Sequence, residues 1–590
     1  MTDQRFMLMA GVILLSLTLA APAPADDALC DGQVIMRALV DELARSMDLQ
    51  MEDLEKPYFI QYTVDDSISY QLAASYGAVI TSKRDRSRDF YSRVRVGSYE
   101  LDNTNFTGAG GGFLFGGMRS GGGGRASLPL DDDYKAIRQA IWGATDDDYK
   151  GAVETLTQKR AYMEDKTLAD RPDDFSKAPA AEANEPGAVL KFDLPAWEEN
   201  LEKISGHFRK YDQVKDSKVQ FFVAAGNKYV VNSEGTRVRT GDTGVLLIVT
   251  AEGQAEDGMK LSESRSYVGE TTDDLPSVSA ITADIDTMVA ELTEAMKSPI
   301  LEQYTGPVLF DGRAAGQMFR EMLAKGVAGS VEPVGSQRRM MGESKSLEQK
   351  IEQRILPASF RVYDDPTVKK QGDTVLFGHY RYDDEGVPAA KVDIVVKGKL
   401  KDMVMCRAPT KKLSGSNGHG RSAPGSGTAE AAIGCLFIET DEGVPNEQLK
   451  SALIDAAKDA GLEYGLRVAS IKSRGLGTSQ MDIMSFFMRR QQGRPAGPGD
   501  PIFVYRVYVD DGREELVRGC EFGPMKTRDL KDIIAAGKTP SVYNYIGLGF
   551  AGATPPTSII APPVLFEELE LSKIEQEHDK LPILKAPLGR

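Results

Sequence analysis

The chain is poor in the side chains on which most metal and nucleophilic chemistry depends. Its 590 residues contain four His and four Cys. No C-x-x-C pair occurs, no two His are close enough in sequence to form a local metal pair, and no G-x-S-x-G motif is present. Four Cys in a chain of this length cannot form a dense disulfide framework. These absences exclude several common classes of metal-binding and redox proteins.

A positive charge excess is also lacking. The formal net charge is −16 and the pI is about 5.0. A negative field of this size repels phosphate backbones and anionic lipid surfaces, so we expect no nucleic-acid partner. After the first 25 residues no run of 18 apolar residues occurs, so no membrane association is expected once that segment is removed.

The first residues resemble an export signal. Residues 6–20 are apolar but too few to span a bilayer comfortably, and Ala23-x-Ala25 has the small-x-small form that signal peptidase cleaves. We therefore predict a signal peptide over 1–25, a mature start near Asp26 and a periplasmic or extracellular location. An uncleaved anchor is the alternative. Export would permit disulfides among Cys30, Cys406, Cys435 and Cys520, with three full pairings possible, and free thiols are an equal interpretation.

Periodicity predicts a mixed structure in the first half of the chain. Residues 31–47 place apolar side chains at helical spacing, and 58–64, 67–79 and 88–96 have the composition of strands. Asn232-Ser233-Glu234-Gly235 is turn chemistry between two further strand patterns, which predicts a hairpin.

Three segments of the first half interrupt these patterns. Residues 108–124 hold ten Gly, which predicts a flexible linker, with a lid as the alternative. Residues 164–190 are polar and rich in Pro and Ala, which predicts a disordered or looping insertion. The acidic runs 131–133 and 146–148 each precede a helical pattern, so we expect helix capping there rather than metal binding.

A domain boundary is expected near residue 300. A helix is predicted over 284–297, a strand over 307–310 and a helix over 312–328, and afterwards short strands alternate with turns around one helix at 446–460. The predicted fold is α+β, with an N-terminal sheet-plus-helix domain over 26–300 and a mostly antiparallel β domain over 301–590.

Three stretches of the second half resemble the TldD/PmbA family of gyrase modulators and zinc metallopeptidases. The first is GPVLFDGRAA at 306–315. The second combines VYDDPT at 362–367 with YDDEGVPA at 382–389. The third joins VVKGKL at 395–400, TKKL at 410–413 and SNGHGR at 416–421. The resemblance is clear over about a third of the chain, and we expect 301–590 to be a TldD/PmbA-like domain.

The resemblance implies a zinc site that this chain does not preserve. Active members carry His-Glu-x-x-x-His on the helix after the first strand and a late Cys as third ligand. Here the matching positions are Arg320, Glu321 and Lys325, and 543–547 reads YNYIG without Cys. An Arg cannot deprotonate to ligate a metal, and a Lys would need a large pKa shift. We therefore expect no cofactor, and we assign no catalytic or metal-binding residue.

Three hypotheses for function follow from these observations. The favoured one is an exported, zinc-free and non-catalytic family member that pairs with a TldD-like homologue having an intact motif, or binds peptide. The second is an active metallopeptidase whose metal site is rebuilt from His379, His419, Cys406 or Cys435 with acids. The third is an envelope ligand-binding protein. Glu321 and Lys325, four residues apart, are expected to form a weak surface pair of a few tenths of a kcal/mol, and His419 to be a satisfied turn residue.

Overall fold

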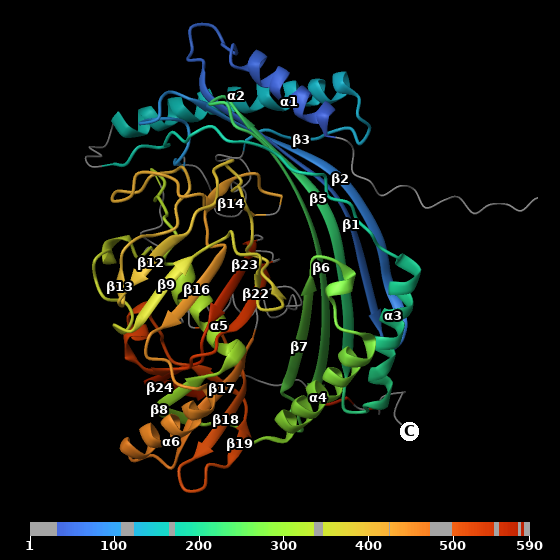
Figure 1. The fold of residues 1–590 in the computed structure, drawn as a ribbon, viewed down its shortest axis with the longest axis vertical. Helices are drawn as coiled ribbons and strands as arrows, with labels where there is room; N and C mark the ends of the chain where they lie inside the picture. Colours follow the sequence, from blue (N-terminus) through green and yellow to red (C-terminus); the bar gives the residue numbers. More distant parts are fainter. Residues whose placement is uncertain are drawn as a thin grey trace, which may run out of the picture.

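The structure is a computed structural model in which residues 32–107, 123–164, 171–335, 346–423, 425–472, 498–547, 554–575, 580–582 and 584 are described. A long curved sheet forms its N-terminal half, and the C-terminal half lies against the concave side of this sheet (Figure 1). Among the described residues, no helix is long and apolar enough to cross a membrane.

The N-terminal sheet is built from long antiparallel hairpins. Its strand order is β3-β2-β1-β5-β6-β4, and β7 pairs with the remaining length of β6. The strands are β1 Pro57–Ser75, β2 Ala78–Val96, β3 Arg125–Ser127, β4 Glu182–Asn184, β5 Asp216–Asn232, β6 Arg237–Gln254 and β7 Lys260–Gly269. The predicted hairpin at 232–235 is confirmed, because it joins β5 to β6 and places Gly235 at φ 102°.

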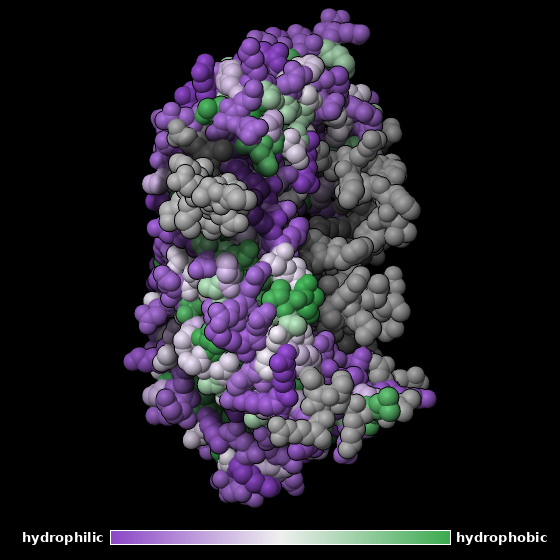
Figure 2. Space-filling model, turned by 90° about the vertical axis from the view of Figure 1, so that its right-hand side faces the viewer, coloured by the Kyte–Doolittle hydropathy of each residue, from purple (hydrophilic) through white to green (hydrophobic). Residues whose placement is uncertain are grey.

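Helices cover the convex face of this sheet because alternate strand residues there are apolar. The helices α1 Gln33–Ser46 and α2 Tyr134–Glu164 pack over one end of the sheet, and α3 Leu194–Gly206 and α4 Val278–Lys297 over the other (Figure 1). Figure 2 shows a largely hydrophilic surface with small separate apolar patches. The predicted helices at 31–47 and 284–297 correspond to α1 and α4.

The C-terminal half contains two larger sheets with a helix between them. The first has the order β19-β18-β17-β8-β24-β20, with β21 paired to β24, and the second has the order β13-β12-β9-β16-β23-β22. The strands of the first sheet are β8 Gln303–Phe310, β17 Tyr464–Ile471, β18 Pro501–Tyr508, β19 Glu514–Val517, β20 Cys520–Phe522, β21 Ile533–Ala536 and β24 Val564–Lys573. The strands of the second sheet are β9 Phe360–Asp364, β12 Val392–Val396, β13 Lys399–Leu400, β16 Cys435–Thr440, β22 Ser541–Gly547 and β23 Thr554–Ala561.

The remaining elements are short. The hairpins are β10 Lys370–Gln371 with β11 Thr374–Val375, and β14 Gly420–Ser422 with β15 Ala429–Ala431. The helix α5 Gly312–Phe319 packs between the two sheets in the largest core cluster, and α6 Leu449–Asp459 lies against β8 and β17. Most strand pairs are antiparallel, so the predicted α+β class with a mostly antiparallel C-terminal half is confirmed.

Several local predictions need correction. The acidic run 146–148 does not begin a helix but lies inside α2, because the helix that starts at Tyr134 continues to Glu164. The helix predicted over 312–328 ends earlier: α5 stops at Phe319 and a π-helical turn follows over Arg320–Ala324. Within the predicted insertion, residues 171–190 are not disordered: Asp174 and Phe175 are buried, and the strand β4 adds to the edge of β6. The rest of this range is loop, as predicted. Residues 108–122 of the Gly-rich segment, residues 165–170 of the insertion and the signal sequence lie outside the described residues.

Candidate functional site

The site implied by the resemblance is built on the segment β8–Asp311–α5. The strand β8 ends in the core, and α5 buries six of its eight residues between the two C-terminal sheets. Gln317 fixes the helix to the end of β17, since its Nε2 donates to the Ile471 carbonyl at 2.7 Å and its Oε1 accepts from the Ile471 N–H at 2.9 Å. The positions after Phe319 are therefore held rigidly against the neighbouring sheet.

The degenerate motif forms a compact charged cluster at the π-helical turn. The Arg320 guanidinium pairs with the Glu321 carboxylate, and Lys325 Nζ lies 3.0 Å from Glu321 Oε2. The predicted pair between Glu321 and Lys325 is thus present, but it is not a surface pair. The side chains of Arg320 and Glu321 are only 10% and 11% exposed, against 45% for Lys325.

The structure also brings the late stretch 543–547 to this cluster. Arg320 lies over the ring of Tyr545, with Cζ 3.2 Å from the ring centroid. One turn earlier, a Cβ added to Gly316 would lie 2.7 Å from the Cβ of Tyr543, so the helix and β22 are in close contact. The two stretches that the resemblance assigns to the zinc site are therefore neighbours in space, as expected if they correspond to the family's ligand positions.

The residues present do not fit a zinc ion. Zinc in proteins is held by thiolate, imidazole or carboxylate groups, whereas these positions carry a guanidinium, an ammonium and a phenol. The guanidinium is itself a cation, and it already contacts both the Tyr545 ring and the Glu321 carboxylate.

The two histidines of the alternative metal site have other partners. His419 is fully buried and has a partner, because its Nε2 lies 3.0 Å from Asp364 Oδ1 while its Nδ1 contacts Asn417. His379 Nδ1 contacts the Pro366 carbonyl at 2.8 Å. In the part of the chain that the structure describes, no group of three or more His, Cys, Asp or Glu side chains could hold a metal.

The described cysteines are buried free thiols. Burial raises the pKa of Cys406 and of Cys520 to about 12, and raises that of Cys435 well above its ordinary value. Thiols with such pKa values are poor nucleophiles and poor metal ligands at neutral pH. Cys30 lies outside the described residues.

A second polar cluster was missed by the sequence analysis, although its residues helped to identify the resemblance. Asp383, Asp384 and Glu385 are all buried, and Asp384 pairs with Lys228 of β5. Asp383 accepts three backbone N–H groups, yet burial and the nearby Glu385 carboxylate raise its pKa well above the usual range. Consecutive acids usually indicate a solvated loop, and only the tertiary fold shows that these connect the C-terminal half to the N-terminal sheet.

These features describe an α+β protein in two parts, with the degenerate motif in its C-terminal half. Residues 303–462 match the family model described as the PmbA/TldA metallopeptidase C-terminal domain. Together with the motifs quoted above, this match over about a quarter of the chain supports an assignment to the TldD/PmbA family.

Two curated relatives match parts of the chain. A metalloprotease of Methanothermobacter thermautotrophicus is 26% identical over 242 residues, covering 40% of this chain and 48% of that one. A metalloprotease of Archaeoglobus fulgidus is 37% identical over 76 residues, covering 13% and 16%. The matched segments thus span less than half the length of these curated relatives.

Two solved structures share the fold. TldE of Thermococcus kodakarensis has a TM-score of 0.53 at 14% identity, covering 91% of this chain and all of that one. A Thermotoga maritima protein described as a modulator of a DNA gyrase has a TM-score of 0.55 at 15% identity, covering 87% and 96%. At these identities the likeness shows the fold alone.

Proposed function

We propose that this protein is an exported, zinc-free member of the TldD/PmbA family that acts without catalysis, as a partner subunit of a TldD-like homologue or as a peptide-binding protein. The observation that carries the proposal is the position of Arg320, whose guanidinium lies between Glu321 and Tyr545 at the place the resemblance gives to zinc. A fixed cation there opposes a divalent metal electrostatically and leaves no lone pair to bind it.

Metal content and partner content test this proposal together. We expect tagged protein purified from its native host to contain well under one zinc per chain by elemental analysis, and to bring with it a homologue whose His-Glu-x-x-x-His motif is intact. Near-stoichiometric zinc that is lost in His419→Ala would instead support the rebuilt metallopeptidase. Specific retention of a small envelope ligand with no homologue present would support the third hypothesis.

Export is tested separately. The motivation is the apolar run at 6–20 followed by Ala23-x-Ala25. N-terminal sequencing of the native protein should give a start near Asp26. A start at Met1 or Thr2 would contradict export by a cleaved signal, whatever the zinc content.

A further inference from the structure

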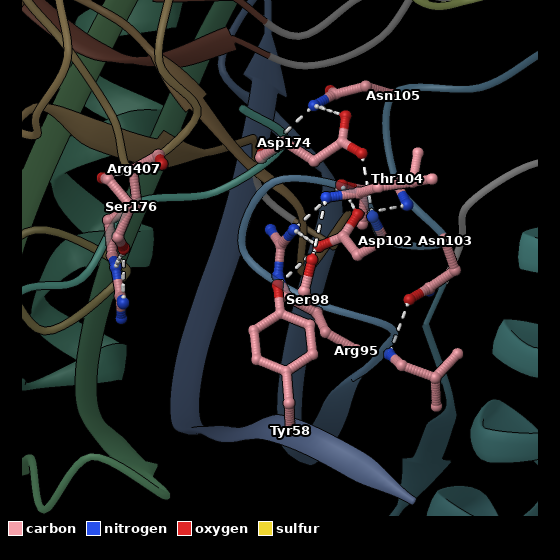
Figure 3. A network of polar contacts seen from close by, with 12 residues as sticks. Tyr58, Arg95, Ser98, Asp102, Asn103, Thr104, Asn105, Asp174, Ser176 and Arg407 are labelled. Carbon is pink, nitrogen blue, oxygen red and sulfur yellow. Dashed lines mark hydrogen bonds and ion pairs between the residues drawn. The ribbon is translucent and has the colours of Figure 1, made fainter. Parts of the chain in front are cut away.

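Residues 171–176, which we name the strap, lie between the two halves of the molecule. On one side they contact the loop after β2, which includes Asp102 and Asn105, and on the other side they contact Arg407 of the C-terminal half (Figure 3). Asp174 and Phe175 are 1% and 2% exposed. Asp174 and Phe175 are thus enclosed from both sides, whereas Asp173 and the following residues 179 and 180 are exposed.

An aromatic side chain is the first anchor of the strap. The ring of Phe175 lies 3.6 Å from Cζ of Arg95 and 4.0 Å from Cζ of Arg407, and its centroid is 4.9 Å from that of Phe59. Two guanidinium groups and a second ring around one aromatic side chain form a specific receptor, because cations are attracted to the faces of aromatic rings.

A carboxylate is the second anchor. Asp174 Oδ2 lies 2.6 Å from Nζ of Lys159, and it also accepts the backbone N–H of Asp102 at 2.9 Å. Lys159 is fully buried in α2, and burial lowers the pKa of its ammonium. A buried ammonium without its counter-ion would be costly, so this position requires an acidic group.

The backbone of the strap and of the segment after it makes hydrogen bonds of the kind that bind an extended peptide. Ser176 N–H donates to the Arg407 carbonyl at 2.8 Å, and Arg407 Nε donates to the Ser176 carbonyl at 2.9 Å. Farther along, β4 adds to the edge of β6 in parallel with Arg237–Arg239. Strand addition combined with pockets for single side chains is a common mode of peptide recognition.

We infer that the groove formed by Arg95, Lys159 and Arg407 is a peptide-binding site occupied by the chain's own strap, and that its ligand class is an extended peptide with an acidic residue directly followed by an aromatic one. Three cations converge there in a chain of net charge −16: Lys159 and Arg407 are fully buried, and the side chain of Arg95 is 15% exposed. Arg95 pairs with Asp102, and Arg407 pairs with Glu234. The inference does not depend on the proposed absence of zinc.

Weakening the strap and supplying it as a separate peptide tests the inference. A fluorescein-labelled peptide with the sequence of residues 171–181 is titrated with the full mature chain and with its Phe175→Ala variant. The tethered strap competes at an effective concentration on the order of millimolar. We therefore expect the variant to bind the peptide at least tenfold more tightly than the unaltered chain does. A peptide with Ala in place of its Phe should bind neither.

The peptide titration includes a matched control variant and a second strap variant. Val189→Ala alters an exposed residue of the same predicted insertion outside the groove, and this variant should bind the peptide no better than the unaltered chain. If Phe175→Ala does not fold, Asp174→Asn replaces it, with the same expected direction. A folded variant that gains no affinity for the peptide would overturn the inference, and so would the unfolding of both variants, because the groove could not then exist without its strap.

Discussion

Asp148 is an acid whose ionisation the fold opposes. It lies in the middle of α2, and its Oδ2 accepts the Val94 N–H at 2.8 Å and the Ser92 hydroxyl at 2.9 Å. Burial nevertheless raises its pKa to about 6. A raised pKa means that the folded state holds this proton more tightly than the unfolded chain, whose Asp pKa is about 3.9.

The expected pH dependence follows from that difference. The stabilising effect of the Asp148 proton is fully present below the unfolded pKa and is lost as pH rises to about 6. Asp148→Asn should therefore be more stable than the unaltered chain at pH 7, on the order of 2 kcal/mol, and less dependent on pH between 4 and 6. Urea unfolding at pH 7 and pH 5 measures this. Asp147→Asn, at the neighbouring exposed position, should show neither change.

Glu321 is expected to matter for stability rather than for hydrolysis. Its carboxylate pairs with the buried Arg320 guanidinium, so Glu321→Gln leaves that cation without its counter-ion. We expect a loss of about 1–3 kcal/mol in the free energy of unfolding and no change in peptidase activity. Lys325→Gln removes the more exposed partner and should cost at most about 0.5 kcal/mol. Casein hydrolysis that disappears in Glu321→Gln would show that the chain is an enzyme.

Sequence spacing could predict only part of this cluster. The contact between Glu321 and Lys325 follows from helical geometry, since residues four apart share a face. The contact of Arg320 with Tyr545 joins the π-helical turn after α5 to the distant strand β22, so no local pattern indicates it. Likewise, the burial of Glu321 depends on the surrounding sheets and cannot be read from its neighbours in sequence.

At the scale of elements, the two acidic runs in α2 show where local reasoning holds and where it fails. In the first run, Asp133 Oδ1 accepts the Ala136 N–H at 2.8 Å, so the predicted cap is present. In the second run Asp148 faces β2 instead, because this part of α2 packs against the sheet. Apolar periodicity on both sides of residues 146–148 is compatible with one long helix or with two shorter helices. Only the packing against the sheet determines which of the two forms.

The cap formed by Asp133 predicts a loss of stability when its side chain is removed. Asp133→Ala removes the acceptor for an otherwise unpaired N–H at the start of α2 and should lower the free energy of unfolding by about 1 kcal/mol. Asp131→Ala, two residues earlier and exposed, is the matched control and should change it by less than about 0.5 kcal/mol. Equal effects of the two substitutions would show that general charge rather than capping controls this helix end.

For the whole molecule, alternating apolar patterns were enough to predict an α+β class with a mostly antiparallel C-terminal half. They could not predict how closely the halves associate. That association depends on polar groups such as Lys228 with Asp384, and Arg407 with Glu234, which are far apart in sequence. Charged residues are usually exposed, so sequence alone gives no reason to place these at a buried contact.

Arg407 should determine whether the two halves unfold together. Its fully buried guanidinium contacts the Ser176 carbonyl, the Glu234 carboxylate and the rings of Phe59 and Phe175, all of them in the N-terminal half. Arg407→Ala should cost about 3–5 kcal/mol, because Glu234 loses its cation and a cavity remains. We expect a single thermal transition in the unaltered chain and two separated transitions in this variant, measured by calorimetry. Arg381→Ala breaks the exposed contact with Glu185 across the same boundary and should leave one transition. A single, merely shifted transition in Arg407→Ala would show that other contacts suffice to couple the halves.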